Sequence, residues 1–265
     1  MKKEETTDLS AGAPGYVPAG AAPAGASDPA PAGTASAALA RHALKTGAFR
    51  LTPREPVLWA SGYSMPVYTD NRLILRTPRG RELVRAGMLS RLADMDLTTP
   101  DTGGQNRYWD AVAGTATAGI APAVLLAEAL NTEFLYVRSG AKEHGLRRRI
   151  EGLAPGEESL AGKRVLLVED LLSTGGSAAA AATALIETGA EVPLCLASFS
   201  YGFEVTQETF AELPGDVPCR PIVVFTLDDL LQEAYSLRLL DEEEIEMIRQ
   251  WRADPFNWGI REKRT

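Results

Sequence analysis

One stretch of this 265-residue chain, VLLVEDLLSTGGS over residues 165–177, constrains the fold more than any other. Its first four residues are apolar and rich in valine, which is typical of a strand buried on both faces of a parallel sheet. Glu169 and Asp170 follow at the carboxyl end of this strand, where open α/β sheets bind their ligands. Small and hydroxyl residues at 173–177 then lead into an alanine-rich predicted helix over 178–187.

The small-residue turn at 173–177 has the composition of an anion site. N–H groups at a helix N-terminus attract phosphate, and glycines let the backbone approach it closely. No lysine follows the glycines, so the Walker A pattern is excluded, and no G-x-G-x-x-G fingerprint is present. We therefore predict a sugar-phosphate site, in which the acid pair accepts hydrogen bonds from vicinal ribose hydroxyls and the turn holds the 5′-phosphate. The alternative is an ordinary βα junction whose acids cap a helix.

Charge and composition exclude several classes of protein. The formal net charge of −8 argues against a general nucleic-acid binder or membrane-surface binder. Cys195 and Cys219 are too few and too far apart for a disulfide framework or a zinc site. The chain has no run of 18 apolar residues, and its start, MKKEETTDLS, has no apolar signal-peptide region. We expect a cytoplasmic protein.

The order of the predicted elements indicates an α/β fold. Residues 1–34 are rich in Ala, Pro and Gly and predict a disordered tail, and residues 35–265 predict one domain. Prolines break residues 48–72 into short extended pieces, which predict a small antiparallel hood. Strands alternating with helices over about 78–225 predict a doubly wound, mostly parallel sheet, followed by helices within 227–252. The strands are predicted at 111–113, 134–137, 165–168, 192–198 and 222–225.

Two further segments point to the same edge of the sheet. Residues 114–119, GTATAG, follow a predicted strand and precede a helix, so they form a second candidate anion site. The basic segment 138–152 lacks helical periodicity and predicts a long mobile loop of the kind that often covers an active site. Arg138, Lys142 and His144 in this loop are candidates to neutralise a pyrophosphate, and a solvated basic surface loop is the alternative.

These stretches together resemble the orotate phosphoribosyltransferases, a branch of the type I phosphoribosyltransferases. The segments that carry the resemblance are WASGYSMPVYTDNR (59–72), AGTATAGI (113–120), YVRSGAKEHG (136–145), IEG (150–152) and VLLVEDLLSTGGS (165–177). The last is shared by phosphoribosyltransferases for many bases, whereas the R-S-x-x-K-x-H-G loop is much more specific to the orotate branch. The resemblance covers the chain from about Ser36 to the C-terminus.

The resemblance implies roles for individual residues. Glu169 and Asp170 match the acid pair that binds the ribose hydroxyls, and Lys142, His144 and Asp170 are the implied catalytic residues. The 5′-phosphate loop is matched by Leu171, Leu172, Ser173, Thr174, Gly175, Gly176 and Ser177. The turn that touches pyrophosphate is matched by Thr115, Ala116, Thr117, Ala118 and Gly119. Arg138 matches the arginine at the loop base, and the hood segment beside the orotate ring is matched by Tyr68, Asp70, Asn71 and Arg72.

Two departures from the family pattern affect these expectations. Many relatives carry a second lysine in the loop, where this chain has Ser139 and Gly140, so one pyrophosphate cation is missing. Relatives also often have Lys-Ser before the hood proline, where this chain has Ser64-Met65. Both departures concern catalytic efficiency more than the class of reaction.

The resemblance implies Mg²⁺-dependent transfer of the phosphoribosyl group from phosphoribosyl pyrophosphate (PRPP) to orotate, giving orotidine 5′-monophosphate and pyrophosphate. Mg²⁺ would be held mainly by substrate and water, with Asp170 as a candidate protein ligand. Arg72 is the expected partner of the orotate carboxylate, with backbone N–H groups of the hood as the alternative. The family also implies a homodimer in which loop 138–152 reaches the neighbouring site. The competing functions are transfer to another base, such as a purine, and a non-catalytic regulator that senses PRPP.

Overall fold

The computed structural model describes residues 34–58, 63–100, 104, 106, 108–140, 149–157 and 159–258. The tail predicted over residues 1–34 lies outside these residues except for Thr34, so the division of the chain at residue 34 stays a prediction. No helix within the described part of the chain has the length and apolar character needed to cross a membrane.

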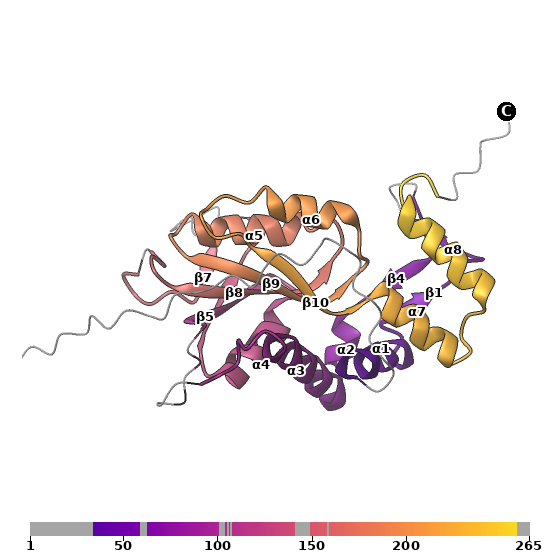
Figure 1. The fold of residues 1–265 in the computed structure, drawn as a ribbon, viewed down its shortest axis with the longest axis horizontal. Coiled ribbons are helices and arrows are strands. Elements are labelled where there is room, and N and C mark those ends of the chain that lie inside the picture. Colours follow the sequence, from indigo (N-terminus) through magenta and orange to yellow (C-terminus); the bar gives the residue numbers. More distant parts are fainter. Residues whose placement is uncertain are drawn as a thin grey trace, which may run out of the picture.

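A six-stranded sheet forms the centre of the fold (Figure 1). Its strand order is β10-β9-β8-β5-β6-β7, and all neighbours pair in parallel except the edge strand β7. The strands are β5 (Ala111–Thr115), β6 (Glu133–Val137), β7 (Ile150–Glu151), β8 (Arg164–Leu172), β9 (Glu191–Ser200) and β10 (Arg220–Thr226). The prediction of a doubly wound, mostly parallel sheet is confirmed.

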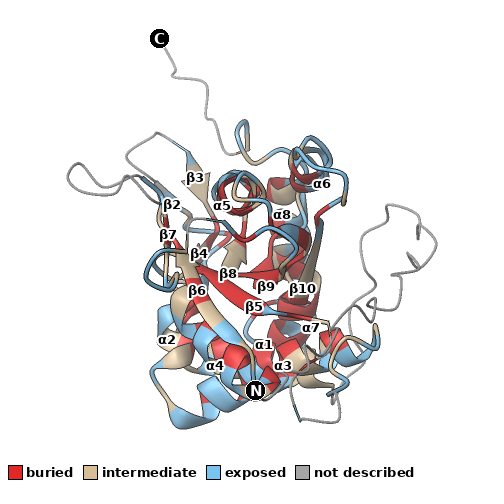
Figure 2. Ribbon diagram, turned by 90° about the vertical axis from the view of Figure 1, so that its left-hand side faces the viewer, coloured by how far each residue is buried: buried red, intermediate tan, exposed pale blue. Residues whose placement is uncertain are grey.

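Helices cover both faces of this sheet. In Figure 1, α5 (Gly176–Ile186) and α6 (Glu204–Ala211) lie on one face, and α3 (Pro78–Ala93) and α4 (Ile120–Leu130) lie on the other. Alternate residues of β8 enter two different cores, because successive side chains of a strand point to opposite faces. Leu166 and Val168 pack on the α3 and α4 side, whereas Val165 and Leu167 pack on the α5 side. The buried central strands are visible in Figure 2.

The hood consists of two small antiparallel pairs. Strand β1 (Phe49–Leu51) pairs with β4 (Val67–Thr69), and β2 (Val57–Leu58) pairs with β3 (Ser64–Met65). The ring of Phe49 lies 4.6 Å from that of Phe199 in β9, measured between ring centroids. The hood is preceded by α1 (Ala35–Lys45) and followed by the short helix α2 (Arg72–Leu75).

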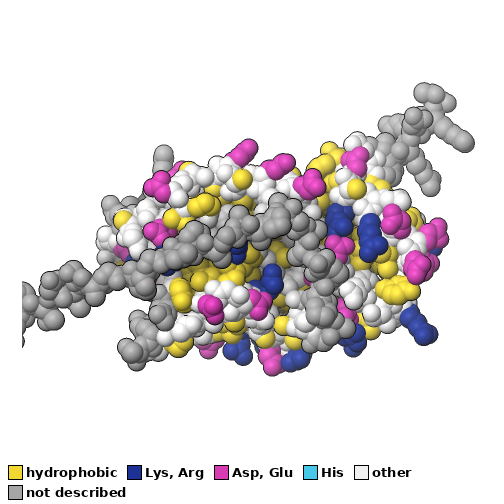
Figure 3. All heavy atoms as spheres, viewed as in Figure 1, with side chains coloured by type: hydrophobic (Ala, Val, Ile, Leu, Met, Phe, Trp, Pro, Cys, Tyr) yellow, Lys and Arg dark blue, Asp and Glu magenta, His cyan; other side chains and the backbone are white. Residues whose placement is uncertain are grey.

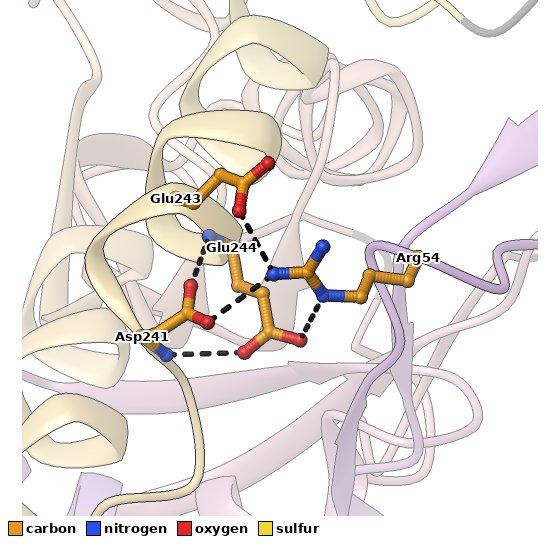
Figure 4. A network of polar contacts seen from close by, with 4 residues as sticks. All are labelled: Arg54, Asp241, Glu243 and Glu244. Carbon is orange, nitrogen blue, oxygen red and sulfur yellow. Dashed lines mark hydrogen bonds and ion pairs between the residues drawn. The ribbon is translucent and has the colours of Figure 1, made fainter.

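The C-terminal helices α7 (Leu227–Ser236) and α8 (Glu242–Ala253) lie at the hood end of the molecule (Figure 1). Arg54, in the loop after β1, contacts three carboxylates at the start of α8 at distances of 3.0 to 3.2 Å (Figure 4). These carboxylates belong to Asp241, Glu243 and Glu244, and Asp241 also caps the helix. Basic and acidic side chains therefore lie side by side at this end of the surface, whereas acidic side chains line the edge near α5 and α6 (Figure 3).

Three local predictions differ from the structure. Residues 138–152 were expected to form one long loop, but Ile150 and Glu151 form the edge strand β7 against Val137 and Tyr136. Strand β8 continues through Leu172, because β9 pairs with it that far, so Leu171 and Leu172 are strand residues and the turn begins at Ser173. Thr115 likewise ends strand β5, so the second turn starts at Ala116.

Candidate functional site

The acid pair lies in the last third of β8, where neighbouring strands β5 and β9 surround it. Glu169 is 7% exposed, and its Oε1 accepts a hydrogen bond from the Asp170 backbone N–H at 2.9 Å. Asp170, on the opposite side of the strand, is half-buried. The pair thus combines one carboxyl group inside the protein with one at the rim, where a ligand has access to it.

Burial, together with a hydrogen bond with the Asp170 side chain, raises the pKa of Glu169 to about 8. A side-chain hydrogen bond with Thr115, itself buried, acts in the opposite direction and favours the charged carboxylate. The raised pKa of Glu169 means that this carboxyl group carries its proton near neutral pH when no ligand is bound. A cation bound beside Glu169 would reverse this preference.

The predicted phosphate loop at residues 173–177 is held from behind by α6. Thr206 donates its hydroxyl hydrogen bond to the Ser173 carbonyl at 2.6 Å, and Thr209 donates to the Thr174 carbonyl at 3.1 Å. In both hydrogen bonds the loop contributes a carbonyl oxygen as the acceptor, so neither of them uses a loop N–H group. No side chain caps the N-terminus of α5, so its first N–H groups are available to an anion.

Gly175 is the residue that makes this loop geometry possible. Its φ of +85° lies in the left-handed region, which side-chain-bearing residues rarely adopt. A Cβ atom here would also lie 3.2 Å from the Phe210 ring and 3.3 Å from the Thr206 methyl group. The loop therefore requires glycine both for its backbone conformation and for its packing against α6.

The second turn, Ala116–Gly119, reaches the same edge of the sheet. The Ala116 N–H donates to the Val137 carbonyl of β6 at 2.8 Å, and the Ala116–Thr117 peptide bond is cis. A Cβ atom on Gly119 would lie 2.2 Å from the Thr115 hydroxyl oxygen, so only glycine allows α4 to begin so close to β5. Gly119 provides no side-chain cap, which leaves the first N–H groups of α4 without a side-chain acceptor.

The hood brings four consecutive residues to this edge. Asn71 is 5% exposed, and its Nδ2 donates to the Asp170 backbone carbonyl at 2.8 Å and to Asp170 Oδ2 at 3.4 Å. Arg72 and Asp70 form an ion pair at 2.7 Å, and the Arg72 guanidinium lowers the pKa of Asp70. The Thr69 hydroxyl forms a 2.9 Å hydrogen bond with Oη of Tyr201, the residue directly after β9.

These segments enclose one cavity of about 230 Å³. Its lining residues come from the hood (Thr69, Asp70, Asn71, Arg72), the second turn (Thr117, Ala118) and the end of β8 (Asp170, Leu171). Part of the predicted site thus converges on one space, where Arg72, Thr117, Ala118, Asp170 and Leu171 meet although the three segments are far apart in the chain. This convergence follows from the parallel sheet, because the carboxyl ends of adjacent strands β5 and β8 meet at one edge.

A second hollow, of about 180 Å³, lies at the other end of the strands, beside Trp109, Arg164 and Leu194. It is lined mainly by apolar side chains and lies at the start of β8 and β9, far from the acid pair along both strands. Ligands of open parallel sheets bind at the carboxyl ends of the strands. We therefore assign the functional site to the cavity beside Asp170.

Several predicted site residues do not line this cavity, among them Glu169 and the predicted phosphate loop at 173–177. The Tyr68 ring faces Arg50, whose guanidinium carbon lies 4.6 Å from the ring centroid. Leu172 is 1% exposed, inside the core below α5. Arg138 forms a long 3.5 Å contact with Glu151 of β7. Lys142 and His144 lie outside the described residues, so their predicted roles stay predictions.

Sequence reasoning did not identify Thr69, Thr206 and Thr209 as contributors to the site. The threonines of α6 lie 33 and 35 residues after the loop carbonyls that they contact. Threonine on a surface helix carries no sequence signal for such a contact, so only the packing of α6 reveals it. Asn71 belonged to the hood segment singled out from the sequence, but its hydrogen bond to Asp170 was not predicted.

The donor set suits Mg²⁺ bound together with a phosphate ligand. Among the residues that the structure describes, no group of three or more His, Cys, Asp or Glu side chains is arranged to hold a metal by itself. Mg²⁺ prefers oxygen ligands and is usually held by one or two carboxylates plus substrate phosphates. Asp170 supplies such a carboxylate at the cavity, and the buried Glu169 precedes it in β8.

Comparisons of the sequence and of the structure with known proteins agree with one another. Residues 101–199 match the family model described as the phosphoribosyl transferase domain. The orotate phosphoribosyltransferase of Bacillus caldolyticus is 38% identical over 224 residues, which are 83% of this chain and 98% of the relative. That of Cytophaga hutchinsonii is 34% identical over 225 residues, covering 83% and 96%. The crystal structure of orotate phosphoribosyltransferase from Aeropyrum pernix is 27% identical, with a TM-score of 0.58 over 77% of this chain and 99% of that one.

Proposed function

This chain belongs to the orotate phosphoribosyltransferase family, and we propose that it transfers the phosphoribosyl group of PRPP to N1 of orotate, releasing pyrophosphate and forming orotidine 5′-monophosphate. The family consists of pentosyltransferases of pyrimidine biosynthesis. One observation carries the proposal for this chain. The hood, the second turn and Asp170 of the acid pair line a single cavity, so groups that suit a base, a pyrophosphate and a ribose meet there.

We assign the parts of PRPP to this cavity and to the adjoining segments at the carboxyl end of β8. The carboxyl groups of Glu169 and Asp170 bind the ribose hydroxyls, and residues 173–177 with the start of α5 bind the 5′-phosphate. The second turn, with the N-terminus of α4, binds the pyrophosphate. Support comes from the two uncapped helix N-termini, which face the same sheet edge and suit a ligand with phosphate at both ends.

The orotate ring would lie against the hood. Arg72 is a candidate partner of the orotate carboxylate, because it lines the cavity and its side chain is 75% exposed. Its present partner is Asp70, so orotate would compete with that carboxylate for the guanidinium. The Tyr68 ring lies beyond the cavity lining, where it supports the hood through Arg50.

The chain's part in the reaction is to position the substrates and to stabilise charge. The two carboxyl groups orient the ribose so that its C1 faces the base, and the hood presents N1 of orotate at that carbon. As pyrophosphate leaves, negative charge grows on its oxygens, where helix N-termini and the predicted loop cations Lys142, His144 and Arg138 stabilise it. Mg²⁺ bound with PRPP supplies further neutralisation of the leaving group.

The first test is the decrease of orotate absorbance in the presence of PRPP, measured with and without Mg²⁺. We expect turnover that requires Mg²⁺, and no turnover when adenine, guanine or hypoxanthine replaces orotate. Turnover with a purine and none with orotate would reassign the base. Intact PRPP binding without any transfer would favour the non-catalytic regulator.

Lys142→Ala tests the role of the loop. We expect kcat to fall by at least about 100-fold, because a cation beside the leaving group acts mainly in the transition state, while the affinity for orotate changes little. Arg164→Ala, at the other end of the strands, is the control. Equal losses in kcat and orotate affinity would contradict the role given to Lys142.

A homodimer and a cytoplasmic location complete the proposal. In the homodimer, loop 138–152 of one subunit would complete the site of the other, as the family resemblance implies. Light scattering after size-exclusion chromatography measures the mass of the particle. Mixing Lys142→Ala subunits with Asp170→Ala subunits tests loop exchange, because only shared sites would recover activity.

A further inference from the structure

The hood and the acid pair are joined directly by one buried side chain, Asn71. Its Nδ2 lies 2.8 Å from the backbone oxygen of Asp170 and 3.4 Å from the carboxylate Oδ2 of the same residue. The two residues are 99 positions apart in the chain. The amide orientation follows from the chemistry, because a carbonyl oxygen only accepts hydrogen bonds and must face the amide nitrogen.

The neighbours of Asn71 do not form this link. Asp70 and Arg72 pair with each other within the hood, at 2.7 and 3.1 Å. Among these three residues, only Asn71 has a side-chain hydrogen bond to β8, whereas the Arg72 charge interacts with Asp170 without such a bond. The Asn71 donor is uncharged, so it holds Asp170 in place without neutralising the carboxylate that the sugar or the cation requires.

The other end of the Asn71 amide indicates that stability alone does not explain this residue. Its Oδ1 is buried and has no hydrogen-bond partner among the described residues. An unsatisfied buried acceptor costs about 1 to 3 kcal/mol, which an apolar side chain would avoid. One end of the Asn71 amide is therefore unfavourable for stability, while the other end donates a hydrogen bond to Asp170.

The hood also has a second attachment to the sheet that does not involve the acid pair. The Thr69 hydroxyl contacts Tyr201 Oη at 2.9 Å, and the Tyr201 ring packs edge-on against Trp251 and Phe199. Loss of the Asn71 amide therefore leaves the hood attached through Tyr201, directly after β9, and through the contact of Phe49 with Phe199 in β9. The two attachments can be removed separately.

We propose that Asn71 is a positioning residue, which sets the Asp170 carboxylate relative to the hood and so fixes the distance between the sugar and the base. This proposal rests on the proposed transferase function. In it, Asn71 contributes through Asp170, and its effect is largest when both substrates are bound. Misplacement of a reacting group by about 1 Å can cost about 100-fold in rate.

The experiment compares the wild-type protein with Asn71→Ala, Asn71→Asp and Tyr201→Phe. We expect Asn71→Ala to lower kcat about 10- to 100-fold while the separate affinities for PRPP and orotate change less than about threefold. Asn71→Asp keeps the size of the side chain but replaces the donor with a second carboxylate, so its kcat should be at least as low. Tyr201→Phe removes only the hydrogen bond between Thr69 and Tyr201 and should have a clearly smaller effect on kcat.

A double-mutant cycle separates positioning from a merely structural role. In an Asp170→Ala background there is no carboxylate to position, so adding Asn71→Ala should lower kcat/KM for PRPP no further. Additive losses in this cycle, or a loss in Tyr201→Phe equal to that in Asn71→Ala, would overturn the proposal. Thermal melts establish that each variant is folded, and Asn71→Asp provides an isosteric variant should Asn71→Ala not fold.

The outcomes also distinguish this proposal from the proposed function. Wild-type transfer together with an unchanged kcat in both Asn71 variants would overturn the role of Asn71 alone. Absence of transfer to orotate in the wild-type protein would overturn both.

Discussion

The buried carboxyl group of Glu169 leads to a specific prediction about stability. Glu169 is 7% exposed, and burial together with the neighbouring Asp170 raises its pKa to about 8 from a usual value of 4.5. The perturbation is Glu169→Gln. Glutamine has nearly the same shape, does not titrate, and can keep the hydrogen bond from the Asp170 N–H.

The sign follows from proton binding in the two states. A carboxyl group whose pKa is raised by folding holds its proton longer in the folded protein, so its contribution to stability is complete below its unfolded pKa of 4.5. That contribution is lost as pH rises towards about 8 and stays constant above it. The full loss is about 5 kcal/mol at 1.36 kcal/mol for each pH unit, and roughly half of it falls between pH 6 and 9. We therefore expect a loss of about 1 to 3 kcal/mol in that range.

The assay is urea unfolding at several pH values from 6 to 9, for the wild-type protein and for Glu169→Gln. The difference between their free energies of unfolding should shift by about 1 to 3 kcal/mol in favour of the glutamine variant as pH rises. Burial lowers the pKa of His42, which gives a slope of opposite sign, but this slope is present in both proteins and cancels in the difference. Glu212→Gln, at an exposed position, is the matched control.

A difference that stays constant from pH 6 to 9 would refute the reasoning. It would mean that Glu169 is already ionised in the folded protein at neutral pH. The buried environment seen in the structure would then have failed to raise its pKa. A pH-dependent difference of similar size in Glu212→Gln would equally remove the link to burial.

Three further predictions follow from the site and its supports. The value of kcat/KM for PRPP should rise with pH up to about 8 in the wild-type protein, because the free enzyme must release the Glu169 proton before cation and ribose bind. The pH profile of Glu169→Gln should lack this rise. Profiles of the same shape in the two proteins would contradict this prediction. Thr206→Val removes the hydrogen-bond donor to the Ser173 carbonyl. Because the loop would lose a hydrogen bond worth about 1 kcal/mol or more, KM for PRPP should rise roughly 10-fold while the affinity for orotate stays unchanged. Initial rates at varied PRPP measure this effect, and the more exposed Thr209→Val should change KM less. Arg54→Gln should lower the melting temperature slightly at low salt but not at about 1 M NaCl, because exposed ion pairs are weak and are screened by salt. The value of kcat should not change. A loss of melting temperature that does not depend on salt would contradict the role of Arg54 as an exposed ion-pair partner.

Much of the site was predictable because its signals are local. The strand, acid pair, turn and helix over 164–186 follow from consecutive residues, and the glycines mark where the backbone must turn or approach closely. The second turn was predicted for the same reason. Predictions failed at boundaries that depend on a partner strand, since β7 has two residues and exists only by pairing with β6. The extension of β8 through Leu172 likewise depends on β9.

The sequence by itself determined the kinds of groups at the site, their order and the α/β class, because hydrophobic periodicity and turn chemistry act over a few residues. Only the tertiary structure decided which groups meet. Strand order places β5 beside β8, and the docked hood brings Asn71 to Asp170 across 99 positions. The raised pKa of Glu169 is also a tertiary property, because it depends on how completely the surrounding strands exclude water from that carboxyl group.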